Sequence, residues 1–192
     1  MPKLKRKAMP ESSILAAAIN EGVIGEARLL RRGKELCFVE VTTRTGDGKP
    51  TGHATLAVRG RMGMTPAQMV QSPLDHGLAE VGPMGKMLKS ANFIAARGLN
   101  VEHMANSSAR ISMPEIAANA DLNGGHHEGA VLALLDTAGA MAAWAETGMG
   151  NYKASTAAIQ AQLHRPQPKG ELVSYARVIN RDTEIFWSHV DV

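Results

Sequence analysis

The chain has 192 residues, of which 44% are hydrophobic and 4% aromatic, so it can form an aliphatic core and is neither disordered nor fibrous. Its net charge of +3 is too small to favour nucleic acid as a partner, although it suits an anionic small molecule. Cys37 is the only cysteine, which excludes an internal disulfide, and no apolar run reaches the roughly 18 residues of a membrane-spanning helix. We therefore expect a cytoplasmic protein without a membrane segment.

The N-terminal part is predicted to be a set of antiparallel strands. A basic arm, KLKRK, comes first and is typical of a solvated tail. Three segments with the alternation and composition of strands follow, at residues 25–33, 35–43 and 51–60. The gaps between them are short, and the second gap contains the turn sequence TGDGKP, so neighbouring segments are expected to pair as antiparallel strands.

The middle part contains a break and then a mixture of helix and strand. Residues 61–84 combine several glycines and prolines with no sustained period, which indicates a linker. Residues 85–98 place apolar side chains at helical spacing and end in Gly98, a typical helix stop. A strand at 107–116 and a loop rich in Asn, Asp and Gly at 117–129 are predicted to follow.

The C-terminal part is predicted to be one long helix, from about Gly129 to Glu146, and then three strands, at 154–165, 170–182 and 185–192. Strands, one apolar helix and further strands together define an α+β fold with an antiparallel sheet. An internal repeat connects the two halves, because residues 27–41 align without gaps on residues 176–190. We favour a duplication as the origin of this repeat. The alternative is a chance match of two amphipathic strand pairs.

The long helix carries one charged residue, Asp136, between Glu128 and Glu146. A helix that is apolar on every side is expected to be buried on every side, where an ionised carboxylate is costly unless it is paired or hydrogen-bonded. Asp136 is therefore a candidate general base or nucleophile. The alternative is a structural aspartate that caps a loop or forms a buried ion pair.

The start of this helix, NGGHHEG, is predicted to leave backbone N–H groups pointing out of its N-terminus, where an anion or a developing oxyanion can bind. Gly129 and Asp136 share one helix face but lie roughly 10 Å apart along the axis. One carbonyl cannot contact both in one chain, so the N-terminus of one helix is expected to face the aspartate of a second, antiparallel helix. The small residues on that face allow a close approach.

The run HEGAVLALLDTAGAMAA resembles the helix of hotdog-fold thioesterases, in the phenylacetate-degradation (PaaI-like) branch, whose pattern is His-Gly-Gly and then an apolar stretch ending in Asp-Thr. The preceding RISMPEIAANADLNGG and the segment from Ser155 to Val192 resemble the strands around that helix. The resemblance covers about residues 85–192. It implies a hotdog fold, in which an antiparallel β-sheet wraps around a long central helix.

The resemblance also implies an activity, the hydrolysis of an acyl-coenzyme A thioester at the interface of a homodimer or homotetramer, without a cofactor. Asp136 would act as base or nucleophile, and the backbone N–H groups of Glu128 and Gly129 would polarise the thioester carbonyl. Thr156, or its neighbour Ser155, would place the attacking water. The residues assigned to substrate binding are His127, Asp121, Asn123, Ser155 and Arg165.

Two departures from the family pattern keep alternatives open. Glu128 stands where the family has the first glycine of its motif, and Asp121 stands where one subgroup has an asparagine, with Asn119 and Asn123 nearby. Both carboxylates would repel the negative charge that develops in acyl transfer. They favour a non-catalytic hotdog module that binds acyl-coenzyme A or assembles with partners. A hotdog hydratase is a further alternative, although no His follows Asp136 within the helix.

Other polar residues are assigned mainly structural roles. His126, His127 and Glu128 lack the spacing of a metal site, and His127 is expected to brace the loop. Cys37 is expected in the core, and GPMGK is expected to be a turn because it lacks the length of a phosphate loop. Four basic residues could meet the phosphates of coenzyme A or be solvated strand ends: His164, Arg165, Lys169 and Arg177.

These observations divide the chain into an N-terminal partial hotdog-like strand segment (1–62), a linker (63–84) and a hotdog thioesterase-like domain (85–192) that lacks its last strand. The N-terminal segment contains a strand of the kind that the domain lacks. We therefore expect strands 25–60 to complete the sheet of the domain, in the same chain or in a partner, because an open sheet edge invites aggregation.

Overall fold

The computed structural model describes residues 11–33, 36–59, 80–122, 124–147, 155–163, 169–182 and 185–192. The chain forms two compact units. The first contains Met1–Ala67 together with Ala154–His164, and the second contains Gln68–Lys153 and Arg165–Val192. The sequence that follows the long helix therefore contributes to both units. Most of the predicted linker lies outside the described residues.

The first unit contains a five-stranded antiparallel sheet in the order β2-β3-β4-β1-β7. Its strands are β1 (Glu11–Ile14), β2 (Val23–Arg32), β3 (Leu36–Thr45), β4 (Pro50–Arg59) and β7 (Ala158–Gln160). The three predicted N-terminal strands are confirmed, whereas β1 was not predicted. Through β1, strands β2, β3 and β4 share a sheet with β7, a strand of the predicted C-terminal domain, and they do not pair with β5, β6, β8 or β9.

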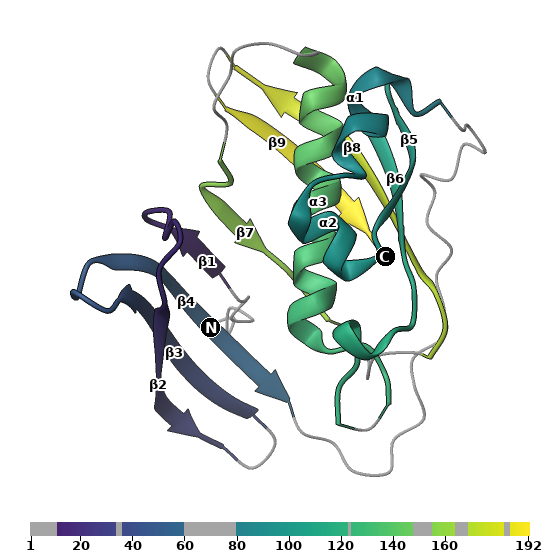
Figure 1. The fold of residues 1–192 in the computed structure, drawn as a ribbon. Helices are drawn as coiled ribbons and strands as arrows, with labels where there is room; N and C mark the ends of the chain where they lie inside the picture. Colours follow the sequence, from purple (N-terminus) through teal and green to yellow (C-terminus); the bar gives the residue numbers. More distant parts are fainter. Residues whose placement is uncertain are drawn as a thin grey trace, which may run out of the picture. The chain divides into compact units, whose positions relative to one another are not determined.

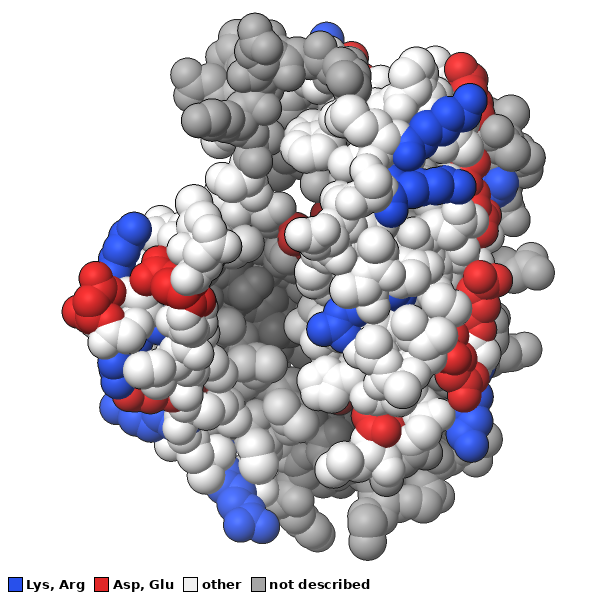
Figure 2. Space-filling view, in the orientation of Figure 1, with Lys and Arg blue, Asp and Glu red and all other residues white. Residues whose placement is uncertain are grey.

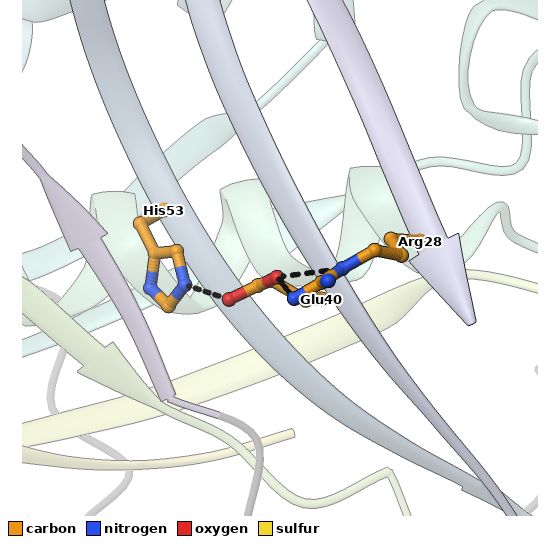
Figure 3. Close-up of polar contacts among 3 residues, drawn as sticks. All are labelled: Arg28, Glu40 and His53. Carbon is orange, nitrogen blue, oxygen red and sulfur yellow. Dashed lines mark hydrogen bonds and ion pairs between the residues drawn. The ribbon is translucent and has the colours of Figure 1, made fainter. Parts of the chain in front are cut away.

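The two faces of this sheet differ in chemistry. Ala27, Val41 and Ala54 lie opposite one another on one face, and the next set along the strands is also apolar. On the other face, Arg28 donates to Glu40 at 2.8 Å, and the second carboxylate oxygen of Glu40 lies 3.3 Å from His53 Nε2 (Figure 3). The Arg28 guanidinium, followed by His53, lowers the pKa of the Glu40 carboxyl. The sheet is therefore amphipathic, with an apolar face and a polar face.

The second unit contains a four-stranded antiparallel sheet in the order β5-β6-β8-β9. Its strands are β5 (Asn100–Ala105), β6 (Ser108–Met113), β8 (Leu172–Arg181) and β9 (Phe186–Asp191). Three of them correspond to predicted strands, and β5 was not predicted. The long helix α3 (Glu128–Thr147) packs against this sheet, as Figure 1 shows. Among the described residues, none of the helices combines the length and the hydropathy that a membrane span requires.

The predicted helix at 85–98 is two short helices, α1 (Gly82–Leu88) and α2 (Asn92–Arg97). The break follows from Ser90, whose backbone N–H and hydroxyl both donate to the Met87 carbonyl. Gly98 ends α2 with a φ of 65°, as predicted for a helix stop. The GPMGK sequence is not a turn but the start of α1, with Pro83 in the first turn, where its missing N–H is tolerated.

The core of the second unit lies between α3 and the sheet. One stripe of the helix is buried: Ala130, Val131, Leu134, Ala138, Met141 and Ala142. The expectation of burial on every side is wrong, because the remaining helix residues are half-buried or exposed. Much of the helix consists of small residues, so an apolar sequence here does not mean that every face of the helix is buried. Asp136 is half-buried, on the flank of the buried stripe.

The internal repeat extends to strand register. Equivalent residues of the two repeats are 149 positions apart, as Ala27 and Ala176 are. With this offset, the first and last residues of β2 correspond to the first and last residues of β8. The pair Ala27–Val41 has its equivalent in Ala176–Val190, and every other pair of the shorter hairpin matches in the same way. Both hairpins have a register shift at the same place, between Leu29 and Arg31 and between Val178 and Asn180. Two unrelated amphipathic hairpins would have no reason to share a bulge, so the structure supports duplication.

The pairing of β1 with β7 follows from the same offset. Glu11 lies opposite Gln160, which is its equivalent in the repeat, and Ser12 and Ser13 lie opposite Ile159 and Ala158. A pair of strands in which one residue faces its own equivalent has the register of a two-fold axis. The strands β1 and β7, one from each repeat, therefore pair in the register that two identical strands would have across a two-fold axis.

Candidate functional site

The loop that leads into α3 is a tight, internally bonded turn. His126 pairs with Ala120 as an isolated bridge, and the His127 N–H donates to the Asn119 carbonyl at 2.7 Å. Asp121 closes the loop, because its N–H donates to the Gly125 carbonyl and its carboxylate accepts from the Gly125 N–H at 3.0 Å. The bond between the Asp121 carboxylate and the Gly125 N–H gives Asp121 a structural role. Its contact with substrate stays a prediction. Asn123 lies outside the described residues.

Two buried side chains attach this loop to the rest of the unit. Asn119 is fully buried, and its amide donates to the carbonyls of Arg97 and Pro114 at 2.9 and 3.0 Å. The Nε2 of His126, which is 1% exposed, lies 2.6 Å from the Gly170 carbonyl. Since a carbonyl only accepts, this nitrogen carries the hydrogen, and the buried Nδ1 has no partner in the described structure. His126 therefore holds the start of α3 close to the start of β8.

His127, which precedes α3, and the first two residues of the helix, Glu128 and Gly129, are exposed. The His127 carbonyl accepts from the N–H groups of Ala130 and Val131 at 2.8 and 3.1 Å. The Gly129 N–H, one of the two predicted oxyanion donors, donates to Nδ1 of the His127 ring at 3.0 Å. His127 thus caps the start of the helix.

Asp136 lies two turns further along α3. The helix is attached to β9 one turn beyond it, because the Ser188 hydroxyl donates to the Gly139 carbonyl at 2.9 Å. Gly139 has no side chain, and a Cβ there would lie 3.5 Å from both Ser188 Cβ and Val190 Cγ2. The backbone around Asp136 is therefore fixed on the sheet. The separation of about 10 Å from Gly129 follows from the regular helix, so Asp136 and the Gly129 amide of one helix cannot both contact the same atom.

The remaining predicted residues belong to other elements of the fold or lie outside the described residues. Thr156 is half-buried and Ser155 is exposed, and both precede β7 in the first unit, whereas Asp136 belongs to the second. Arg165 and His164 lie outside the described residues. Lys169, which precedes β8, and Arg177, which lies within it, are both exposed. Cys37 is half-buried in β3.

Charge is mixed over the visible surface. On the face drawn in Figure 2, Lys and Arg side chains lie among Asp and Glu side chains, and the coloured residues form no continuous field of one sign. No group of three or more His, Cys, Asp or Glu residues in the described ranges could hold a metal ion.

Sequence reasoning missed the anchoring roles of Asn119 and His126. His126 and His127 were considered together as metal ligands, yet one is buried and the other exposed. Neighbouring residues in extended backbone point to opposite sides, so the adjacent histidines could have been assigned different environments.

Residues 123–192 match the family model described as the Thioesterase superfamily. This range includes α3, β7, β8 and β9, and no curated protein matches the chain.

Several solved structures share the fold over nearly the whole chain. A protein described as a thioesterase from Novosphingobium aromaticivorans is 13% identical with a TM-score of 0.63, over 94% of this chain and 70% of its own. The tesB protein of Mycobacterium avium subs paratuberculosis is 13% identical with a TM-score of 0.59, over 94% of this chain and 69% of its own. A protein described as a thioesterase II from Thermobifida fusca is 18% identical with a TM-score of 0.57, over 96% of this chain and 73% of its own. The chain thus has the hotdog-like fold of thioesterases, with antiparallel sheets and a long central helix.

Proposed function

We propose that the protein hydrolyses acyl-coenzyme A thioesters. The observation that carries this proposal is the position of Asp136 on α3, two turns after a helix N-terminus whose amides can face a carbonyl. The Thioesterase superfamily match over residues 123–192 and the hotdog-like fold support it. The spacing from His127 to Asp136 further supports the PaaI-like branch of that fold.

In the proposed reaction, water attacks the thioester carbonyl carbon and transfers a proton to the Asp136 carboxylate. The carbonyl oxygen becomes an oxyanion, which accepts hydrogen bonds from the Glu128 and Gly129 N–H groups. The carbon–sulfur bond then breaks, and the thiolate of coenzyme A takes up the proton. If Asp136 instead attacks the carbonyl carbon itself, the carbon–sulfur bond breaks, the thiolate of coenzyme A leaves, and an anhydride forms between the acyl group and Asp136. Water then cleaves this anhydride, which releases the acid, restores the Asp136 carboxylate and supplies the proton that the thiolate takes up.

The site is assembled from two helices, because Asp136 and the Gly129 amide of one helix are too far apart to contact one carbonyl. We place the site in a homodimer or homotetramer, with Thr156 or Ser155 next to the attacking water. Asp121, Asn123 and Arg165 contact the substrate, and the cationic side chain of Arg165 suits the phosphates of coenzyme A. His127 acts on the site through its bond to the Gly129 amide.

A second candidate function is a hotdog module that binds acyl-coenzyme A without cleaving it. The exposed Glu128 carboxylate at the helix start favours it, because negative charge there opposes an oxyanion. The bond between the His127 ring and the Gly129 N–H favours it as well, since it occupies a predicted donor.

Thiol release from a panel of short, long and aromatic acyl-coenzyme A esters tests the proposal. We expect turnover by the wild type and its loss, by about 10²-fold or more, in Asp136→Asn, because a general base contributes on this scale. Glu146→Gln is the matched control: it makes the same carboxylate-to-amide change on α3, where Glu146 pairs with Arg181 at 2.6 Å.

Each result separates the candidates. Equal turnover in Asp136→Asn would make Asp136 a structural residue. No turnover by the wild type, combined with binding of the esters by calorimetry, would favour the binding module instead. Circular dichroism of both variants shows whether a loss of turnover reflects a loss of fold.

A further inference from the structure

The contact between His127 and Gly129 has a direct bearing on the proposed oxyanion site. A backbone N–H that already donates to a side chain is not available to a developing oxyanion. The Gly129 N–H is in this state, because the Nδ1 of His127 accepts it at 3.0 Å. Either the site lacks this donor, or the ring leaves when substrate arrives.

We propose, building on the proposed function, that His127 is a displaceable cap, whose ring holds the Gly129 amide until a thioester carbonyl replaces it. His127 is a positioning residue in this scheme, because it acts through the amide and not on the substrate. The ring is exposed, so it can rotate into water without leaving a buried cavity. The exchange replaces one hydrogen bond by another, and no covalent bond changes.

The neighbouring His126 explains why only the ring has to move. His126 is 1% exposed and bonded to the Gly170 carbonyl, and the His127 N–H is bonded to the Asn119 carbonyl. These two bonds hold the backbone of the loop while the His127 side chain turns. The adjacent histidines therefore have different roles: His126 anchors the backbone of the loop, and the side chain of His127 is the movable cap.

The absence of a side chain at Gly129 favours the closed state. A Cβ at this position would lie 3.1 Å from His127 Nδ1 and 3.3 Å from Cε1, which is closer than side chains normally pack. A Cβ there would therefore displace the ring by a few tenths of an ångström and weaken its bond to the amide. Gly129→Ala should open the cap while keeping the backbone N–H, and so offers a second route to the open state.

Two substitutions of His127 test the inference. His127→Ala removes the acceptor, whereas His127→Asn retains a side-chain oxygen of the kind that caps helix starts. We expect kcat/KM to rise about fivefold in His127→Ala, the factor that corresponds to one ordinary hydrogen bond, and to stay near the wild-type value in His127→Asn. His189→Ala, which removes an exposed histidine from β9, is the matched control.

A second readout does not depend on turnover. Amide hydrogen exchange at Gly129, measured by NMR, should be faster in His127→Ala and in Gly129→Ala than in the wild type. Saturation with S-(2-oxopropyl)-coenzyme A, a ketone analogue that cannot be hydrolysed, should shift the Gly129 amide and the His127 Nδ1 resonances together.

The outcomes distinguish this inference from the proposed function. Unchanged exchange at Gly129 in His127→Ala would show that the cap does not form, and would overturn the inference. A freed amide with unchanged or lower kcat/KM would overturn it too. If the wild type has no turnover, the proposed hydrolysis fails, and displacement of the His127 ring by the bound ketone then decides the inference alone: coupled shifts support it and their absence overturns it.

Discussion

The hairpins β2–β3 and β8–β9 have the same register and the same bulge, yet they differ in what covers them. In the second hairpin, Ala176 is 2% exposed and belongs to the core under α3. Its equivalent in the first hairpin, Ala27, is exposed, as is every residue of β2. Register is therefore a property of the hairpin itself, while burial depends on the element that packs on its face.

The largest expected difference concerns this matched pair of alanines. Ala176→Asp should lower the free energy of unfolding by about 3 kcal/mol or more, because it places a carboxylate in the core. Ala27→Asp should lower it by about 1 kcal/mol or less, since the carboxylate stays in water. Urea unfolding of both variants measures the difference. Equal losses would contradict the comparison.

A smaller effect is expected where the hairpins differ in chemistry. Ser188, which donates to the Gly139 carbonyl of α3, corresponds to Val39 in the first hairpin. Ser188→Val should lower the free energy of unfolding by about 1 kcal/mol, the usual net value of one hydrogen bond. Ser188→Thr keeps the hydroxyl and serves as the control. A fully stable Ser188→Val would mean that this bond does not attach α3 to β9.

The smallest effect is expected on the polar face, where Glu40 of the first hairpin corresponds to His189 of the second. Arg28 and then His53 lower the pKa of Glu40 below its usual 4.5, so its ionised form stabilises the folded state. This contribution is complete above pH 4.5 and is lost as the pH falls through the lowered pKa. Glu40→Gln should therefore flatten the acid limb of a melting-temperature profile, whereas His189→Gln should leave it unchanged.

Strands β2, β3 and β4 of the first unit could be predicted because their alternation is regular and their gaps are short. Strand β5 was missed because it carries Glu102 and His103 among its apolar residues. His103 is nevertheless buried, since its ring accepts from the Glu80 N–H and bonds to Ser108. Long-range partners of this kind are invisible in a local pattern.

The candidate site was predictable only in part. The sequence located α3 and the lone Asp136, and its apolar composition predicted burial on every side. The structure buries one stripe, because helix burial depends on how many elements pack around it. The bond between His127 and Gly129 depends on one side-chain rotamer, which no periodicity encodes.

The junction of β1 and β7 has a consequence for how the protein responds to dilution. A symmetric strand junction between separate chains is in equilibrium with free subunits, and it dissociates as the concentration falls. Here both strands belong to one chain, so each meets the other at an effective concentration that the intervening sequence sets. The pairing therefore persists at any dilution, and the two strands can diverge in sequence independently, as Glu11 and Gln160 already have.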